Sequence, residues 1–509
     1  MDPAMREYTF HEVKGPPELQ YSMGGSVCAF LTVMVLCMSL HGSTADESYS
    51  GGDSDEAPMD KSEKVALYSA IRGFVGDWWN GSDLYPDPCG WTPIQGVSCD
   101  LFNGQWSVTS LNIGPVHDNS LVCSENPLFT PHMFHLKHLK SISFFSCFVK
   151  PAQTLPSDIY WDQFPGSLES VEFRSNPGLT GGIPGSFGRL LNLQSLVILE
   201  NGLDGVLPTS LGSLSGLKRL VLSGNRFTGT IPDCLGAMPD LLILDVSGNS
   251  LSGPLPPSIG DLISLLKLDL SNNMLQGKLP SELGKLKSLT LLDMRNNQFS
   301  GGLAESFQGM ELLEELVLSG NPLGGKLDAI EWKNLKSLTV LDLTATGMSG
   351  EIPRTFSQLK KIRFLGLSNN SLSGYLPQKL ESLPCLSSLY INGNNLTGKI
   401  KFSPGFYSRM GRRFGAWDNP NLCYPIDELG PTNFPYRVRP CGQQEEEERE
   451  MLWDSIPRGK LLDSGYGGAR GDFHFLHPLG FSSNGVDGIH PGNFWLDVML
   501  LSVVLNNIL

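Results

Sequence analysis

The segment Leu217-Lys-Arg-Leu-Val-Leu-Ser-Gly-Asn-Arg-Phe-Thr-Gly-Thr-Ile-Pro232 decides the fold, because its pattern returns every 24 or 25 residues along the chain. Apolar residues stand eight, five and three positions before Asn225 and two positions after it, and a glycine and an Ile-Pro pair follow. A tenth copy has Thr346 in place of the asparagine. The other asparagines are Asn176, Asn201, Asn249, Asn273, Asn297, Asn321, Asn370 and Asn394. Such regular spacing is the signature of a repeat protein.

The unit LxxLxLxxNxLxGxIP is that of a leucine-rich repeat, and it predicts an α/β repeat fold, a right-handed solenoid. Each apolar-x-apolar trio should form a short strand whose two apolar residues point inward while the middle residue faces out. Stacking places these strands about 4.8 Å apart in a parallel concave sheet. We expect each asparagine to bond backbone groups of its own repeat and the next. The Thr346 hydroxyl can make only part of these hydrogen bonds. The array should therefore be least regular around Thr346 and in the two repeats before it, where Ala304 and Asp328 stand in place of the repeat proline.

Changes in composition divide the chain. An apolar run from Val27 to Leu40 is followed by a small-x-small cleavage signal at Ser43-Thr44-Ala45, which predicts a signal peptide, with a retained signal anchor as the alternative. The predicted parts are an extension of doubtful translation (1–22), signal peptide (23–45), linker (46–59), N-terminal cap (60–107), ten regular and two degenerate repeats (108–400), C-terminal cap (401–441), polar linker (442–485) and hydrophobic tail (486–509).

Both ends of the array should be covered. Residues 60–79 read as an amphipathic helix with a capping box of Asp60 and Glu63. Its apolar face should cover the first repeat and consists of Leu67, Ile71, Phe74 and Trp78. The repeat period stops after Ile400, where the closing cap follows.

The cysteines indicate a secreted protein. Two pairs should each close a disulfide over a solenoid end, worth about 3 kcal/mol for loops of this length: Cys89 with Cys99, and Cys423 with Cys441. Cys123 and Cys147 are candidate partners whose pairing stays open, and Cys147 stands at the asparagine position of an early degenerate repeat. Cys234 and Cys385 should be unpaired core thiols. Three sequons predict glycosylation at Asn80, Asn369 and Asn395.

The last sixteen residues, Phe494 to Leu509, are mostly apolar, and small residues and a short spacer precede them at Ser482 to Gly485. This order fits the signal for a lipid (GPI) anchor. The alternatives are a transmembrane span, for which the segment is short, and a tail with neither role.

Charge and motifs exclude several functions. The net charge of −15 and the pI near 5.1 argue against nucleic acid as a partner. The sequence has no kinase signature, no Gly-x-Ser-x-Gly elbow and no Cys-x-x-Cys or His-x-x-x-His spacing. We therefore predict no catalytic residue, no metal and no cofactor, and expect function to reside on a surface.

The outward strand residues of the concave face are the candidate binding residues. Asp245, Asp269 and Asp293 should stack about 5 Å apart, with Lys267 and Arg295 offsetting their repulsion. They could form a strip for a basic peptide or protein loop; the alternative is that they only solvate the face. A second candidate patch, of exposed aromatic rings beside an arginine, could instead pack against the Cys423 region. The full candidate set is Glu172, Arg219, Asp245, Lys267, Asp269, Asp293, Arg295, Asp342, Arg363, Phe364 and Tyr390.

The Gly-x-Ile-Pro ending of the repeat, Trp78-Trp79 and the segment Asp87-Pro-Cys-Gly-Trp-Thr-Pro-Ile-Gln-Gly-Val-Ser-Cys99 resemble plant extracellular leucine-rich repeat receptor-like proteins. The resemblance covers about residues 61–441. It implies a receptor-like protein without a kinase, on the outer face of the plasma membrane, acting in responses to root-colonising microbes or in development. The expected partners are a protein or peptide ligand and a receptor-like kinase as co-receptor.

One alternative function is a secreted inhibitor of microbial cell-wall-degrading enzymes, similar to polygalacturonase-inhibiting proteins and located in the apoplast or cell wall. That class has a similar number of repeats but no hydrophobic tail, so residues 494–509 favour the receptor.

Overall fold

The computed structural model describes residues 58–116, 120–164, 166–425 and 435–442. All but the last three of these belong to one unit, Met1–Arg439, and a second unit comprises Pro440–Leu509. The predicted N-terminal extension, the signal peptide, nearly all of the polar linker and the whole hydrophobic tail lie outside the described residues. In the part that the structure describes, no helix is long and apolar enough to cross a membrane.

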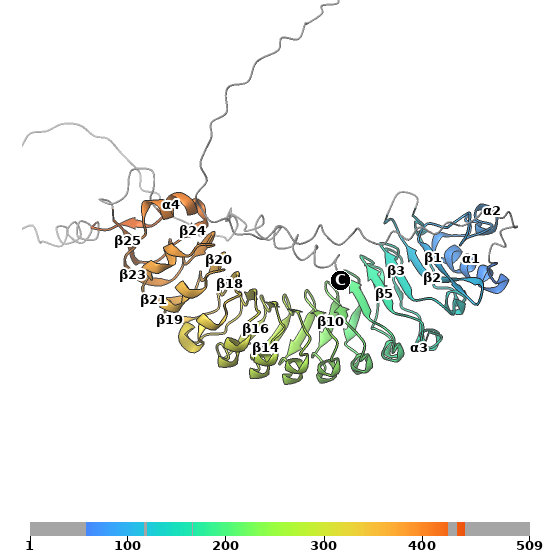
Figure 1. Cartoon of the computed structure of the whole chain (residues 1–509), viewed down its shortest axis with the longest axis horizontal. Helices are drawn as coiled ribbons and strands as arrows, with labels where there is room; N and C mark the ends of the chain where they lie inside the picture. Colours follow the sequence, from blue (N-terminus) through green and yellow to red (C-terminus); the bar gives the residue numbers. More distant parts are fainter. Residues whose placement is uncertain (1–57, 117–119, 165, 426–434, 443–509) are drawn as a thin grey trace, which may run out of the picture. The chain divides into compact units, whose positions relative to one another are not determined.

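The repeats form an arc whose inner side is a sheet (Figure 1). Within the described residues this sheet has 14 strands, parallel throughout except for the antiparallel pair β1–β2. Equivalent positions of successive repeats pair without stagger, so Lys267 lies between Ile243 and Leu291. In spatial order the strands are β1 (Val97–Phe102), β2 (Gln105–Ile113), β3 (Ser141–Phe145), β5 (Ser170–Arg174), β7 (Ser195–Leu199), β9 (Arg219–Val221), β11 (Ile243–Asp245), β13 (Lys267–Asp269), β15 (Leu291–Asp293), β17 (Glu315–Val317), β18 (Val340–Asp342), β20 (Phe364–Gly366), β22 (Ser388–Tyr390) and β24 (Phe414–Gly415).

Shorter strands build a second set of sheets beside the first. One has the order β16 (Gln298–Ser300), β14 (Met274–Lys278), β12 (Ser250–Gly253), β10 (Arg226–Gly229) and β8 (Asp204–Val206). Another has β19 (Ser349–Glu351), β21 (Ser371–Tyr375), β23 (Asn395–Lys399), β25 (Asn421–Tyr424) and β26 (Arg439–Pro440). A third pairs β4 (Gln153–Thr154) with β6 (Leu179–Thr180).

Short helices complete the repeats. The outer side of the arc carries 3-10 helices (Figure 1). Their bounds are η1 (Pro131–His135), η2 (Gly185–Arg189), η3 (Thr209–Ser213), η4 (Asp233–Ala237), η5 (Pro257–Asp261), η6 (Ser281–Lys285), η7 (Glu305–Gly309), η8 (Leu327–Ala329), η9 (Trp332–Asn334), η10 (Arg354–Gln358), η11 (Gln378–Ser382) and η12 (Gly411–Arg413). The α-helices are α1 (Lys61–Val75), α2 (Gly81–Leu84), α3 (Asp158–Trp161) and α4 (Pro404–Met410).

The repeat asparagines form a continuous ladder of hydrogen bonds inside the solenoid, in which each asparagine is one rung. The Asn273 side-chain amide donates to the carbonyls of Leu270 and Ser271 in its own repeat and of Val246 in the preceding one, at 3.0–3.2 Å. Its Oδ1 accepts from the backbone amide of Leu251, also in the preceding repeat. The prediction of a bond to the next repeat therefore had the wrong direction. Each side chain ties its repeat back to the one before it.

Thr346 replaces the missing rung in part, as predicted. Its hydroxyl is 2.7 Å from the Leu343 carbonyl and 3.0 Å from Asn370 Oδ1. The lateral sheet is interrupted here, since the repeat that precedes Thr346 contributes no strand between β16 and β19. Two short helices, η8 and η9, replace the usual one, and the buried Trp332 fills the space beside them. The array is thus irregular where the sequence lost its asparagine and its proline.

The N-terminal cap differs from its prediction in three respects. Helix α1 ends at Val75, and Trp78 lies outside it with 74% of its side chain exposed, so Trp79 is the buried tryptophan. Asp60 caps the helix by accepting from the amides of Ser62 and Glu63. The Glu63 carboxylate does not complete a capping box but accepts from the amide of Val108 at 2.7 Å. It therefore joins the cap to the sheet.

The C-terminal cap continues the repeat, so the prediction that the period stops after Ile400 is wrong. Asn419 is a further rung: its amide donates to the Ile391 and Ala416 carbonyls at 3.0 Å, and its Oδ1 accepts from the amide of Leu396. Strand β24 extends the concave sheet and β25 the lateral one. An irregular segment that includes α4 separates Ile400 from β24. This segment breaks the 24-residue spacing, so the last repeat could not be recognised from the sequence pattern.

The predicted disulfide between Cys89 and Cys99 is confirmed. Cys123 is bonded to Cys147, a pairing that the sequence left open, and Cys423 and Cys441 are both disulfide-bonded. The remaining two described cysteines, Cys234 and Cys385, form no disulfide. Both are only partly buried, so they are not the core thiols that were predicted; Cys234 lies on the outer helix η4 and its Sγ is 3.1 Å from the Thr209 carbonyl.

Candidate ligand-binding surface on the concave sheet

Each central strand presents two side chains to the concave side. The observed strands begin one residue earlier than the predicted trio: β13 is Lys267–Asp269, with Leu268 buried in the core between two outward residues. The candidate set from the sequence contains the charged or aromatic residues at the later of these positions and only some residues at the earlier one. The earlier positions it missed include Ile243, Leu291 and Glu315. Alternation about the fully buried central leucine was the signal that could have found them.

A mixed charged network occupies the centre of the sheet. Lys267 Nζ lies 3.1 Å from Asp245 Oδ2 and 3.6 Å from Asp269 Oδ2. Arg295 Nε lies 3.3 Å from Asp293 Oδ2. The predicted pairing of the two cations with the stacked carboxylates is therefore present. These carboxylates are mostly buried and also cap the turns that follow, as when Asp269 Oδ1 accepts from the amide and hydroxyl of Ser271. Much of the network thus stabilises the sheet itself.

Burial perturbs the acids of this network. Burial and the neighbouring Asp269 carboxylate raise the pKa of Asp293 to about 7, although Arg295 opposes the shift. Burial also raises the pKa of Asp269, of Asp342 and, together with Glu314, of Glu315. For Lys267, burial acts to lower the pKa, but Asp245 and Asp269 outweigh it and the net direction is upward. The centre of the face consequently gains negative charge as the pH rises towards neutrality.

An apolar cluster lies next to this network on the concave face. Val197, Val221 and Ile243 on β7, β9 and β11 form a cluster separate from the main core, with Leu199 and Leu242 packed against it. Two predicted residues border this cluster. Arg219 lies at the start of β9, next to Val221, and Glu172 on β5 pairs with Arg174 at 2.9 Å.

The C-terminal part carries the aromatic residues. Phe364 on β20 and Tyr390 on β22 lie with ring centroids 5.9 Å apart. Phe364 is only 9% exposed, so the prediction of an exposed ring is wrong for this residue. Val340 lies beside it on the neighbouring strand and the Tyr390 ring lies on its other side. Tyr390 is partly exposed, and Arg363, immediately before β20, is exposed. Within this second patch, the structure thus brings the Phe364 and Tyr390 rings together.

All three predicted glycosylation sequons are accessible. Asn80, Asn369 and Asn395 are exposed. Asn369 precedes the rung Asn370, at the edge of the concave sheet, whereas Asn395 begins the lateral strand β23. Glycans at these two positions would flank the C-terminal repeats on two sides.

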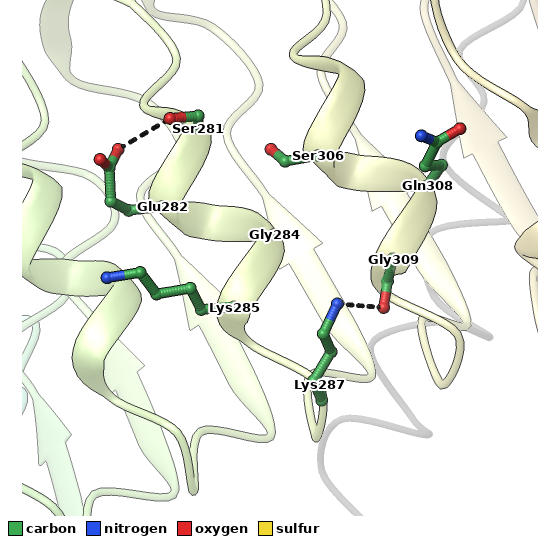
Figure 2. Close-up of a pocket in the computed structure, with 8 residues that line it drawn as sticks. All are labelled: Ser281, Glu282, Gly284, Lys285, Lys287, Ser306, Gln308 and Gly309. Carbon is green, nitrogen blue, oxygen red and sulfur yellow. Dashed lines mark hydrogen bonds between the residues drawn. The ribbon is translucent and has the colours of Figure 1, made fainter.

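A shallow pocket of about 470 Å³ lies on the outer side, between η6 and η7 (Figure 2). Its two lysines are already engaged: Lys285 Nζ is 3.0 Å from Asp261 Oδ1, and Lys287 Nζ donates to the Gly309 carbonyl at 2.8 Å. The pocket marks a gap between consecutive short helices and does not overlap the candidate set on the concave sheet.

Comparison with known proteins agrees with this architecture. A family model described as "Leucine rich repeat" matches residues 167–252 and 336–396, and a second one matches 264–286 and 288–310. Piriformospora indica-insensitive protein 2 of Arabidopsis thaliana is 60% identical over 81% of this chain and 99% of its own length. Protein TOO MANY MOUTHS of the same plant is 34% identical over 28% of each chain.

Solved structures show the same fold. The PEPR1–AtPEP1 structure matches 71% of this chain and 52% of that one, with 26% identity and a TM-score of 0.55. The ectodomain of the Arabidopsis thaliana receptor kinase GASSHO1/SCHENGEN3, in complex with CASPARIAN STRIP INTEGRITY FACTOR 2, matches 71% of this chain and 47% of that one, with 27% identity and a TM-score of 0.52. The chain belongs to the plant leucine-rich repeat receptor-like proteins and is a member of the family of Piriformospora indica-insensitive protein 2.

Proposed function

We propose that this protein is a non-catalytic cell-surface receptor that binds a protein or peptide ligand on its concave sheet and works with a kinase-bearing co-receptor. The observation that carries the proposal is the sheet itself. Its 14 strands present apolar, charged and aromatic side chains in succession along one continuous inner surface. One of the similar structures is the ectodomain of the plant membrane receptor kinase GASSHO1/SCHENGEN3, in complex with CASPARIAN STRIP INTEGRITY FACTOR 2, which supports the proposal.

The biological setting is part of the proposal. The name of the relative with 60% identity refers to insensitivity to Piriformospora indica, which supports a role in the response to root-colonising microbes; a role in development is the alternative. The signal peptide, the three glycans and attachment to the outer face of the plasma membrane through residues 486–509 belong to the same proposal. Treatment of intact cells with a phosphatidylinositol-specific phospholipase should release the protein if the anchor is a lipid. Mature protein found free in the apoplast would contradict surface attachment.

Affinity capture with matched variants tests the receptor function. The secreted chain would be used as wild type, as a concave variant with Lys267→Glu and Arg363→Glu, and as an outer-face variant with Lys333→Glu and Lys336→Glu. Lys333 and Lys336 are exposed; Lys333 lies in the outer helix η9 and Lys336 follows it, so neither lies on a strand of the concave sheet. The proposal expects a receptor kinase and a ligand that the wild type and the outer-face variant retain and the concave variant loses.

The same material tests the alternative function. A secreted inhibitor of cell-wall-degrading enzymes would reduce the activity of a fungal polygalacturonase at stoichiometric concentration and would capture no receptor kinase. Such a result would replace the receptor proposal. The inhibitor reading rests on a comparable number of repeats, whereas the 60% identity over almost the whole relative favours the receptor.

A further inference from the structure

Basic side chains gather at the C-terminal end of the described repeats, although the chain as a whole has a net charge of −15. Residues 399–425 and 435–442 contain a single acidic side chain, Asp418. The basic ones are Lys399, Lys401, Arg409, Arg412, Arg413, Arg437 and Arg439. Within these two stretches the positive charges outnumber the single negative one, which favours an anionic partner at their surface. Asp427 and Glu428 stand between the stretches in the sequence, and the acidic run Glu445 to Glu448 follows them.

A row of aromatic rings crosses the sheet next to these charges. Phe364 on β20 and Tyr390 on β22 are neighbours, and Trp417 follows β24. Gly415 permits this arrangement, because a Cβ atom there would lie 2.8 Å from both the Trp417 and Tyr390 rings. Tyr436 continues the row, with its ring centroid 6.1 Å from that of Trp417. The row therefore joins the concave face to the cap.

A cavity of about 420 Å³ opens at the end of this row. Trp417 lines it together with Arg437, which lies in a turn, and Arg439, which begins β26. Among the described residues, neither guanidinium has a carboxylate within salt-bridge distance. The residues that line the cavity are Ala416, Trp417, Asp418, Asn419, Pro420, Leu422, Arg437, Val438 and Arg439.

The backbone holds Arg437 in an uncommon conformation. Its φ is +54°, in the left-handed region that most non-glycine residues avoid. The guanidinium lies 5.9 Å from the centre of the Tyr436 ring, a cation–π distance that orders the two side chains. Tyr436 is nevertheless 58% exposed and Arg437 is exposed. An aromatic ring and a planar, ordered cation thus face solvent at the mouth of the cavity.

We propose that this Trp–Arg cavity, formed by Trp417, Arg437 and Arg439 with Tyr436 at its mouth, binds a carboxylate-rich segment of a partner protein. Arginine pairs with carboxylates through two parallel hydrogen bonds. Tryptophan, tyrosine and arginine are also the residues that dominate the energy of protein interfaces. The site goes beyond the proposed receptor function, because it uses the C-terminal cap and does not require a ligand on the centre of the concave sheet.

Direct binding measurements with the full mature chain test the site. The probe is a fluorescein-labelled peptide of ten glutamates interrupted by one tyrosine, and its lysine counterpart is the charge control. The proposal expects saturable binding of the glutamate peptide that weakens at least about tenfold in Arg437→Gln/Arg439→Gln and in Trp417→Ala, and that also weakens as salt is raised. The matched control, Lys333→Gln/Lys336→Gln, removes two exposed cations from the outer side and should bind like the wild type.

Each remaining outcome counts against the proposal. It is overturned if the wild type binds neither peptide, if both peptides bind equally, or if the control variant loses as much affinity as Arg437→Gln/Arg439→Gln. A decameric oligogalacturonide distinguishes a polysaccharide ligand, and tight binding of that probe without binding of the glutamate peptide would also overturn it. Circular dichroism of Arg437→Gln/Arg439→Gln checks folding, since Arg437 is exposed and Arg439 partly exposed and their replacement should leave the fold intact.

Discussion

The side chain of Asn176 accepts a hydrogen bond from the backbone amide of Cys147 at 2.8 Å, which joins the asparagine ladder to a disulfide. Cys147 occupies the rung position of its own repeat and is bonded to Cys123. The covalent bond therefore takes the place of an asparagine at the start of the array. We expect the double variant Cys123→Ser/Cys147→Ser to lose about 3 kcal/mol of unfolding free energy, because 24 residues separate the two cysteines.

Chemical denaturation followed by tryptophan fluorescence measures this loss. The Cys234→Ser variant is the matched control, since Cys234 forms no disulfide. Equal stability of the double variant and the wild type would show that the ladder alone closes this end of the array.

The ladder predicts opposite effects at two rungs. Asn273→Ala should destabilise the protein by about 3 kcal/mol, because it leaves several buried backbone groups without a partner. Thr346→Asn should stabilise it by about 1 kcal/mol by restoring a full rung, since the threonine bonds only the Leu343 carbonyl and Asn370. Urea denaturation compares them with Gln298→Ala, at an exposed strand position. Destabilisation by Thr346→Asn would mean that the interrupted repeat is adapted to threonine.

A glycine recurs at the same position of the outer helix in several successive repeats, and a methyl group should not be tolerated there. In successive repeats Gly236 and Gly260 face the next outer helix, and a Cβ atom would lie 2.2 Å from the Ser258 carbonyl and 2.3 Å from the Glu282 carbonyl, respectively. Gly260→Ala should therefore cost about 2 kcal/mol or more, as overpacking does. Gly166→Ala is the control, because nothing lies within 4 Å of its Cβ position. Thermal unfolding should separate the two variants; equal melting temperatures would contradict the close contact.

The acids of the concave face predict a pH dependence. The pKa of Asp293 is about 7 in the folded protein against 3.8 for an ordinary aspartate, so the folded state holds a proton that the unfolded state has released. Stability should therefore fall as the pH rises from about 4 to 7. Asp293→Asn should flatten this fall, with a gain on the order of 1 kcal/mol at pH 7.5 and none at pH 4.

The exposed Asp261 provides the control for that measurement. Its carboxylate pairs with Lys285 in solvent, so Asp261→Asn should change stability little at either pH. A fall in stability on Asp293→Asn at pH 7.5 would show instead that the ionised carboxylate, paired with Arg295, is the stable form.

The three exposed sequon asparagines should carry glycans, because their side chains are accessible. Asn80, Asn369 and Asn395 are exposed, and each lies in an Asn-x-Ser/Thr sequence. We expect three glycans on the secreted protein, and replacing all three asparagines with glutamine should abolish the mass shift on treatment with peptide N-glycosidase. Glycopeptide mass spectrometry assigns the individual sites. If Asn395 carried no glycan, the surface of the lateral strand β23 around this residue would remain accessible to a partner.

The sequence predicted the repeat fold well because the same buried positions recur in every copy. Leu220, Leu244, Leu268 and Leu292 all lie fully buried at one position, and a pattern repeated this often outweighs any local exception. The additional rung at Asn419 was missed because α4 and its flanking residues break the spacing. The left-handed backbone of the residue before each rung was also not predicted from the sequence. It recurs at Gly224, Gly248, Asn272 and Asn296.

The binding surface was harder to predict than the core. Outward positions follow from the strand alternation, but their accessibility depends on neighbours in adjacent repeats, which a single repeat does not reveal. Phe364 illustrates this, since it faces outward and is still only 9% exposed. The Trp–Arg cavity depends on Trp417 and Arg437 coming together from distant parts of the cap. No spacing in the sequence indicates such a contact.

The unstaggered stacking of the strands also acts as a ruler for any extended chain lying across them. Neighbouring strands are about 4.8 Å apart, whereas an extended peptide advances about 3.3 Å per residue. Three ligand residues therefore span roughly the same length as two repeats. Because side chains of an extended chain alternate between its two faces, those facing the sheet would return to the same repeat position only at every sixth residue, or every four repeats. A periodic receptor of this kind would therefore select ligands by spacing as well as by composition.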